Sequence, residues 1–130
     1  MRKSPVGRIR TFSKLNGKKL WTLFDSGSRS TYITKAAAKG LHRERLAVPT
    51  KAILGGKAHR IEEMCAISAN IEGHPLHTLA RVIDDIGKDE EGKSIEILFG
   101  ALSMQEWGIR LDVPKERLDW THYTREFVEY

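Results

Sequence analysis

Residues 21–29 read WTLFDSGSR, a run of large apolar side chains that ends at Asp25, with Ser26, Gly27 and Ser28 directly behind it. An apolar run of this kind is typical of a strand buried on both faces, so we expect Asp25 at the end of a strand and inside the protein. A buried carboxylate is unfavourable unless it is paired or hydrogen-bonded. The sequence therefore predicts a specific role for Asp25.

The residues before this run predict a β-hairpin. The segment GRIRTFSKLNGKKLWTLF, residues 7–24, has two strand-like stretches on either side of Asn16-Gly17. This dipeptide is typical of a tight hairpin turn, because both residues tolerate a positive φ. The middle of the chain is also rich in strand-like stretches, and turns are expected at Gly55-Gly56 and at Glu72-Gly73.

Two short helices are expected. Thr34 can cap a helix over residues 35–39, and Ser103 with Glu106 forms a capping-box pattern for one or two further helical turns that end at Gly108. The sequence thus predicts a mainly β protein with little helix.

The length predicts one domain over residues 1–130. A chain of 130 residues with 40% hydrophobic content can build one compact core, which we place at about residues 7–113. Residues 84–94 are polar and acidic and are expected to form an exposed loop, and residues 114–130 are treated as a C-terminal extension.

Composition argues against several classes of partner. The net charge is +5, but the basic residues are scattered and the aromatic content of 8% forms no stacking platform, which favours a solvated basic surface over nucleic-acid binding. No apolar stretch approaches a membrane span, and residues 1–12 have no apolar run of the leader-peptide type. Cys65 is the single cysteine, so no internal disulfide can form. A cytoplasmic protein is expected.

No metal site is predicted. The carboxylates of residues 84–94 lack the spacing of a calcium loop. His74 and His77, three residues apart on an expected strand, point to opposite faces.

The order of these features resembles the retropepsin-like (retroviral-type) aspartic proteases. In that family an apolar strand ends in an Asp-Ser/Thr-Gly motif, here at residues 25–27, and two apolar residues with a glycine precede a late helix, here Leu98-Phe99-Gly100. The resemblance covers about residues 7–113. It implies a single-domain, closed-barrel-like acid protease fold with short helices that acts as a homodimer on a peptide or protein substrate and needs no cofactor.

The resemblance also implies a mechanism. Amide hydrolysis by an aspartic protease uses two adjacent carboxyl groups that share one proton and titrate as a unit. The chain holds one such motif, so Asp25 would meet Asp25 of a second copy across a two-fold axis. Ser26 would bond to the partner's loop, and Gly27 and Ser28 would lie along the substrate. Further substrate contacts would come from a mobile hairpin and from one strand residue, namely Ile53, Leu54, Gly55, Gly56, Lys57 and Leu98.

Two alternatives remain from the sequence. One is a catalytically inactive or latent peptide- or protein-binding module with the same fold. The other is a basic nucleic-acid-binding protein, which is the less favoured of the two because the basic residues are scattered along the sequence. Ser26 or Ser28 as a nucleophile is not predicted, because the chain has no Gly-x-Ser-x-Gly elbow.

Overall fold

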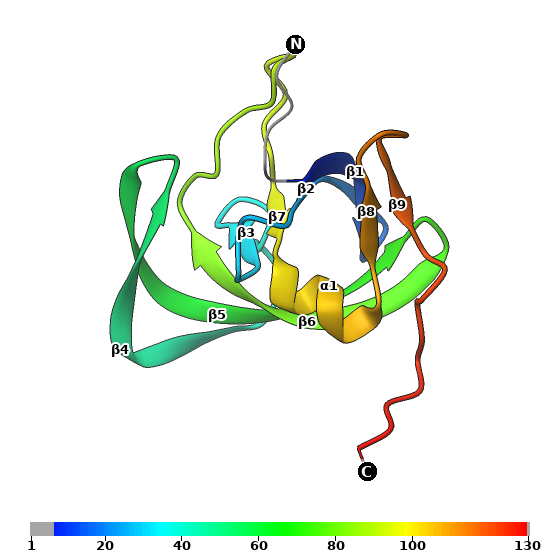
Figure 1. Cartoon of the computed structure of the whole chain (residues 1–130). Helices are drawn as coiled ribbons and strands as arrows, with labels where there is room; N and C mark the ends of the chain where they lie inside the picture. The colour runs from blue at the N-terminus through cyan, green and yellow to red at the C-terminus, as the bar shows by residue number, and fades with distance from the viewer. Residues whose placement is uncertain (1–6, 130) are drawn as a thin grey trace.

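The computed structural model describes residues 7–129. Residues 1–6 and 130 lie outside this range. The prediction that residues 1–12 hold no leader peptide therefore falls partly outside the described residues. The described elements are β1 (Arg8–Leu15), β2 (Lys18–Asp25), β3 (Tyr32–Thr34), β4 (Arg43–Leu54), β5 (Lys57–Ile71), β6 (His74–Ile83), β7 (Ile97–Phe99), α1 (Ala101–Trp107), β8 (Arg110–Asp112) and β9 (Arg117–Asp119) (Figure 1). The prediction of a mainly β, single-domain protein is confirmed.

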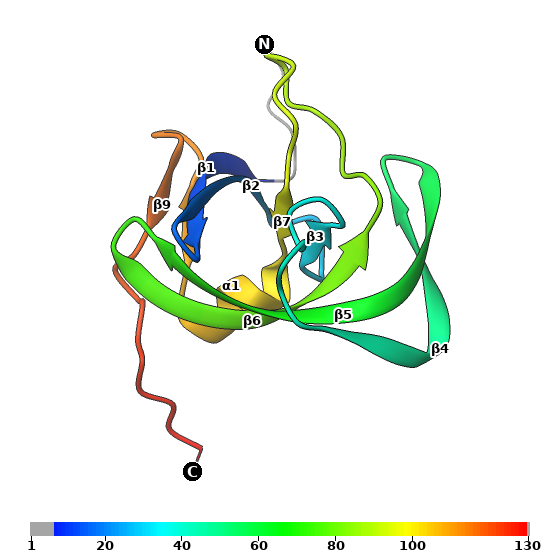
Figure 2. The same ribbon diagram turned by 180° about the vertical axis from the view of Figure 1, so that it is seen from behind.

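One strongly curved sheet forms the body. Its strand order is β1-β2-β7-β3-β6-β5-β4, and an additional antiparallel pairing of β1 with β5, at Lys14 and Asn70, closes it into a barrel-like shape (Figure 1). β7 pairs parallel to β2 and antiparallel to β3, so it lies between the two strands that flank the Asp25 loop. Seen from behind, the long β4–β5 hairpin projects from this body (Figure 2).

The three predicted hairpin turns are confirmed. The central pairs Asn16-Gly17, Gly55-Gly56 and Glu72-Gly73 all have positive φ, between 49° and 84°. Each pair separates two strands that are in register on either side of it. This geometry is the two-residue turn whose twist matches that of the flanking strands.

The strands around Asp25 are buried on both faces, as predicted for β2. In each of β2, β3 and β7, two consecutive side chains point to opposite faces of the sheet and pack in two different hydrophobic clusters. The smaller cluster holds Leu23, Tyr32 and Leu98. The main core holds the residue that follows each of them, namely Phe24, Ile33 and Phe99. The rings of Phe24 and Phe99 lie 5.0 Å apart. Because a slip of one residue would exchange the two faces, this packing fixes where β2 ends and hence where Asp25 lies.

The helix expected over residues 35–39 is wrong. This segment forms hydrogen-bonded turns instead. Thr34 does act as a cap, since its Oγ1 accepts from the N–H of Ala37 at 3.2 Å, and the N–H of Ala38 donates to the carbonyl of Thr34 at 2.9 Å. The next backbone bonds span three residues, from Lys39 to Ala36 at 3.4 Å and from Leu41 to Ala38 at 3.0 Å, so the segment continues as turns and not as an α-helix.

The capping box at Ser103 and Glu106 is also wrong, although the helix exists. α1 begins at Ala101, and its N-cap is Gly100, three residues before Ser103 and with no side-chain cap. Ser103 lies inside the helix and is buried, because its hydroxyl bonds to Thr31 and Thr78. The predicted end is confirmed: Gly108 has a left-handed φ of 71°.

The C-terminal residues contribute more structure than the sequence indicated. β9 pairs with β8 in a small separate hairpin, visible beside β1 in Figure 1. Beyond it, Trp120 stacks on the His74 ring with 3.9 Å between the ring centroids. The loop of residues 84–94 is mostly exposed and contains one isolated bridge, between Lys88 and Ser94.

Candidate active site

Asp25 ends β2 and is 7% exposed. Its Oδ1 accepts a hydrogen bond from the N–H of Gly27 at 2.8 Å, and its Oδ2 lies 3.3 Å from Nε of Arg8 in an ion pair. Both carboxylate oxygens therefore have a partner, which is how the single chain accommodates this buried charge.

Ser26 ties the Asp25 loop to the residue that precedes β1. Its N–H donates to the carbonyl of Gly7 at 3.0 Å, and its hydroxyl accepts from the N–H of Gly7 at 3.0 Å and reaches the Gly7 carbonyl at 3.3 Å. The side chain thus supports the loop within one chain. Its bond to the loop of a partner chain stays a prediction.

The loop is also locked to the start of α1. The N–H of Ala101 donates to the carbonyl of Ser28 at 2.6 Å, and that of Leu102 donates to the carbonyl of Arg29 at 3.1 Å. Two helix N–H groups that have no partner within α1 are satisfied in this way. The Asp-Ser-Gly loop and the Leu-Phe-Gly segment thus form one structural unit, although some 70 residues separate them.

Gly100 is the point of closest approach in this unit. An added Cβ would lie 2.2 Å from the carbonyl oxygen of Ser30 and 2.8 Å from that of Arg29. The N–H of Gly100 donates to Oγ1 of Thr31 at 3.0 Å. Only a residue without a side chain allows this contact between the loop and the helix.

A cleft of about 840 Å³, here called the central cleft, opens over the Asp25 loop. Most of the residues predicted to form the site line it, namely Asp25, Gly27, Ser28, Ile53, Leu54, Gly55 and Leu98. The structure does not bring the other three to its lining. Ser26 bonds to Gly7, and Gly56 and Lys57 lie exposed at the tip of the β4–β5 hairpin.

The apolar floor of the central cleft includes residues that the sequence analysis missed. Leu98 pairs in register with Leu23 of β2 on one side and with Tyr32 of β3 on the other, so the three side chains form a row across the sheet. The apolar run that leads to Asp25 could have indicated Leu23, because Leu23 lies two residues before Asp25 and so on the same face of β2. Ile86 and Ile95, which also line the cleft, carry no such signal, because tertiary folding alone brings their loop to it.

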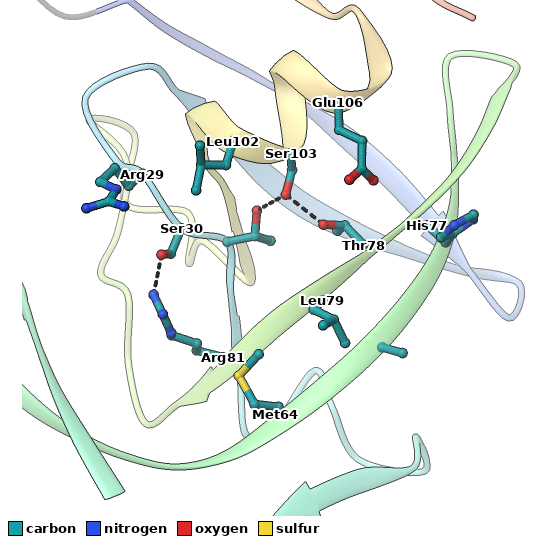
Figure 3. A pocket seen from close by; sticks show the side chains of 12 residues that line it. Arg29, Ser30, Met64, His77, Thr78, Leu79, Arg81, Leu102, Ser103 and Glu106 are labelled. Atoms are coloured by element: carbon teal, nitrogen blue, oxygen red, sulfur yellow. Dashed lines mark hydrogen bonds between the residues drawn. The ribbon is translucent and has the colours of Figure 1, made fainter. Parts of the chain in front are cut away.

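A second pocket, of about 440 Å³, lies between α1 and the β5–β6 hairpin (Figure 3). The Ser103 hydroxyl lies 2.8 Å from that of Thr31 and 2.6 Å from that of Thr78, and Arg81 donates to Ser30. These hydroxyl groups bond to one another, so the pocket offers structural support beside the central cleft rather than an activated nucleophile.

Five of the described titratable groups have shifted pKa values, all of them away from the cleft, and Asp84 and Cys65 are two of these. The hydrogen bond with His59 holds the pKa of Asp84 below its ordinary value, and burial raises the pKa of the Cys65 thiol. Cys65 is thus a buried apolar residue. Within residues 7–129, no cluster of His, Cys, Asp and Glu side chains could hold a metal ion.

Comparison with known proteins rests on structure. No model of a protein family matches the sequence, and no curated protein matches it. Among solved structures, the retroviral protease-like domain of Ddi1 from Leishmania major superposes with a TM-score of 0.64 at 16% identity, over 87% of each chain. The protein has a retropepsin-like fold. The resemblance recognised in the sequence is thereby confirmed at the level of the fold.

Two viral proteins extend this retropepsin-like comparison. The EIAV protease, solved with the inhibitor HBY-793, matches with a TM-score of 0.59 at 17% identity, over 85% of this chain and 98% of the viral one. The foamy viral protease-reverse transcriptase, solved with an RNA/DNA hybrid, matches with a TM-score of 0.51 at 10% identity. That match covers 77% of this chain but 12% of the viral protein.

A membrane-spanning helix is absent from residues 7–129, where α1 is far too short to cross a bilayer.

Proposed function

We propose that this protein is an aspartic endopeptidase that acts as a homodimer, in which two Asp25 carboxyl groups share one proton. The observation that carries the proposal is the position of Asp25. It is a nearly buried carboxyl group that ends a strand, is held by the N–H of Gly27, and lines a cleft large enough for a peptide.

The proposed reaction needs one carboxylate and one carboxylic acid. The carboxylate takes a proton from a water molecule while the water oxygen attacks the carbonyl carbon of the peptide bond, and the acid gives its proton to the carbonyl oxygen. The carboxyl group that took the water proton then gives it to the amine nitrogen as the C–N bond of the tetrahedral intermediate breaks, and the other carboxylate takes a proton from a hydroxyl of the intermediate. The products are a new carboxyl terminus and a new amino terminus, and the pair regains its shared proton.

A second copy of the chain would supply the second carboxyl group. Ser26 and Gly27 are exposed in the single chain, directly beside the buried Asp25. They therefore offer a surface next to the site that a two-fold partner can cover with the same residues. The Ser26 hydroxyl would then bond to the Asp25 loop of the second copy as well as supporting the loop of its own chain.

The substrate would lie extended between the Asp25 loop and the β4–β5 hairpin. Ile53 of this hairpin is 67% exposed, although it is large and apolar and lines the central cleft. Closure of the hairpin over a peptide would bury it, together with Leu54 and the backbone of residues 55–57. Gly27, Ser28 and Leu98 would contact the peptide from the opposite side.

The Asp25→Asn variant tests this mechanism. Asn keeps an oxygen that can accept from the Gly27 N–H but cannot exchange the proton, so cleavage of a peptide should fall by about 10²–10⁴-fold. Glu91→Gln, which removes an exposed carboxylate outside the cleft, is the matched control and should cleave like the wild type. Equal cleavage by Asp25→Asn and wild type would refute the proposal.

The homodimer has its own test. Mixing wild-type chains with an excess of Asp25→Asn chains should lower the activity per wild-type chain, because mixed dimers hold one functional carboxyl group. Activity that stays constant as the variant is added, at concentrations where sedimentation shows mixed dimers, would contradict a shared site.

One observation favours a second candidate, a peptide-binding module without catalysis. In the single chain the Arg8 guanidinium occupies Oδ2 of Asp25 at 3.3 Å, and an arginine kept there would oppose the shared proton. This candidate predicts that the wild type binds peptides and returns them uncut, whereas the endopeptidase returns fragments. A cytoplasmic location stays a prediction from the sequence.

A further inference from the structure

The walls of the central cleft carry far more positive than negative charge. The whole chain is moderately basic, with 22 basic and 17 acidic residues. The cleft, in contrast, is lined by a single carboxylate, that of Asp25, and by five basic side chains, namely Arg8, Arg29, Lys51, Arg81 and Lys88. The imbalance therefore belongs to the cleft and is not an average property of the surface.

These cations come from separate parts of the chain. Arg29 follows the Asp25 loop, Lys51 lies on β4, Arg81 on β6, and Lys88 in the loop of residues 84–94. Arg8 is paired with Asp25, but within residues 7–129 none of the other four has a carboxylate oxygen within 4.0 Å. Arg81 is held in place by its bond to Ser30 (Figure 3).

The carboxylates of the neighbouring acidic loop, residues 84–94, do not line the central cleft, and three of them bond to groups outside it. Asp84 lies 2.7 Å from Nδ1 of His59, and Glu90 lies 2.7 Å from Arg10. Asp89 accepts from the indole N–H of Trp21 at 2.9 Å. The side chains of this loop that reach the central cleft are those of Ile86 and Lys88.

We propose that the central cleft selects acidic peptide segments, with apolar residues at the cleaved bond and Asp or Glu on either side of it. This inference rests on the proposed function, which supplies an extended peptide as the ligand. The row of Leu23, Leu98 and Tyr32 suits the apolar residues. The four unpaired cations around it suit flanking carboxylates, because a cleft with low-dielectric walls of one charge concentrates ligands of the opposite charge.

The test compares three peptides of one length that share an apolar cleavage site and carry Glu, Gln or Lys at the flanking positions. We expect kcat/KM to fall in the order Glu, Gln, Lys, and the preference for Glu to shrink as salt is raised, because the cations are exposed or half-buried. Equal rates for the three peptides would overturn the inference.

Variants that each remove one positive charge show which residues cause the preference for acidic peptides. Lys51→Gln and Arg81→Gln should each lower the Glu-to-Gln preference by about two- to fivefold, the range of exposed ion pairs. Lys115→Gln removes the same charge from an exposed position outside the cleft and should leave the preference unchanged. Lys51 is exposed, so its variant remains informative if Arg81→Gln fails to fold. An equal effect of Lys115→Gln would assign the preference to net charge and overturn the inference.

Binding to the Asp25→Asn variant separates this inference from the proposed function. Fluorescence anisotropy with the labelled peptides needs no hydrolysis and should give the same order of affinity. Cleavage by the wild type without this order would support the endopeptidase activity and overturn the acidic preference. Binding in this order without any cleavage would support the acidic preference and overturn the endopeptidase activity. A single-stranded oligonucleotide that binds more tightly than the Glu peptide, and loses affinity with Lys51→Gln, would overturn the assignment to peptides.

Discussion

Replacing Gly100 by alanine would force apart the two segments that build the Asp25 site. The added Cβ would lie 2.2 Å from the Ser30 carbonyl oxygen, whereas ordinary contact begins near 3.4 Å, so the loop and the helix must separate by about 1.2 Å. Gly100 has φ −92° and ψ 175°, an extended conformation that alanine adopts freely. The steric clash is therefore the whole cost, with no contribution from backbone strain.

The size of the effect follows from what the separation breaks. The bonds from Ala101 to Ser28 and from Leu102 to Arg29 would lengthen together, at about 1 kcal/mol each. Overpacking of the rigid carbonyl groups adds about 1 kcal/mol or more. We expect the free energy of unfolding to fall by about 3 kcal/mol and Tm to fall by roughly 10 °C.

Urea unfolding followed by tryptophan fluorescence measures this loss. Gly17→Ala is the control, since its Cβ would meet nothing within 4 Å and the cost comes only from a φ of +79°, at about 1 kcal/mol. If Gly100→Ala is no less stable than Gly17→Ala, the loop and α1 are not locked as the structure indicates.

Three further predictions concern groups outside the cleft. Because burial raises the pKa of Cys65, its thiol should react with a disulfide reagent far more slowly in the native than in the urea-unfolded protein, and equal rates would contradict its burial. The pKa of Asp84 is lowered by His59, so ionised Asp84 stabilises the fold above its ordinary value of 3.8, and this contribution disappears as pH falls through the lower folded value. Between pH 5 and 2 the Tm of Asp84→Asn should therefore fall less than that of the wild type; parallel Tm curves would contradict the contact. Ser103→Ala removes one buried and one part-buried hydroxyl contact and should lower the free energy of unfolding by about 1–3 kcal/mol in urea, whereas an unchanged midpoint would show that the two threonines find other partners.

Local sequence rules predicted the features that depend on a few adjacent residues. The three hairpins follow from pairs such as Asn16-Gly17, because a positive φ at both positions is a property of the dipeptide itself. The burial of β2 on both faces follows from its continuous apolar run, and this placed Asp25 at the end of an interior strand. The order of these features was enough to recognise the retropepsin-like fold.

Local rules failed where a distant partner decides the structure. Ser103 looks like a helix cap in sequence, but the hydroxyl groups of Thr31 and Thr78 hold it in the middle of α1. Residues 35–39 resemble a helix, but the N–H of Lys35 donates to the carbonyl of Ile83 on β6, and the segment forms turns. β9 carried no clear signal, since it forms only by pairing with β8.

The sequence by itself determined that Asp25 ends a buried strand and is followed by a loop of small residues. Only the tertiary structure decided what surrounds that carboxyl group: Arg8 on one oxygen, Gly100 against the loop, and a cleft with cations from several elements. The physical reason is that a turn or an apolar strand depends on neighbours in the chain, whereas a cleft depends on side chains that folding brings together from distant positions.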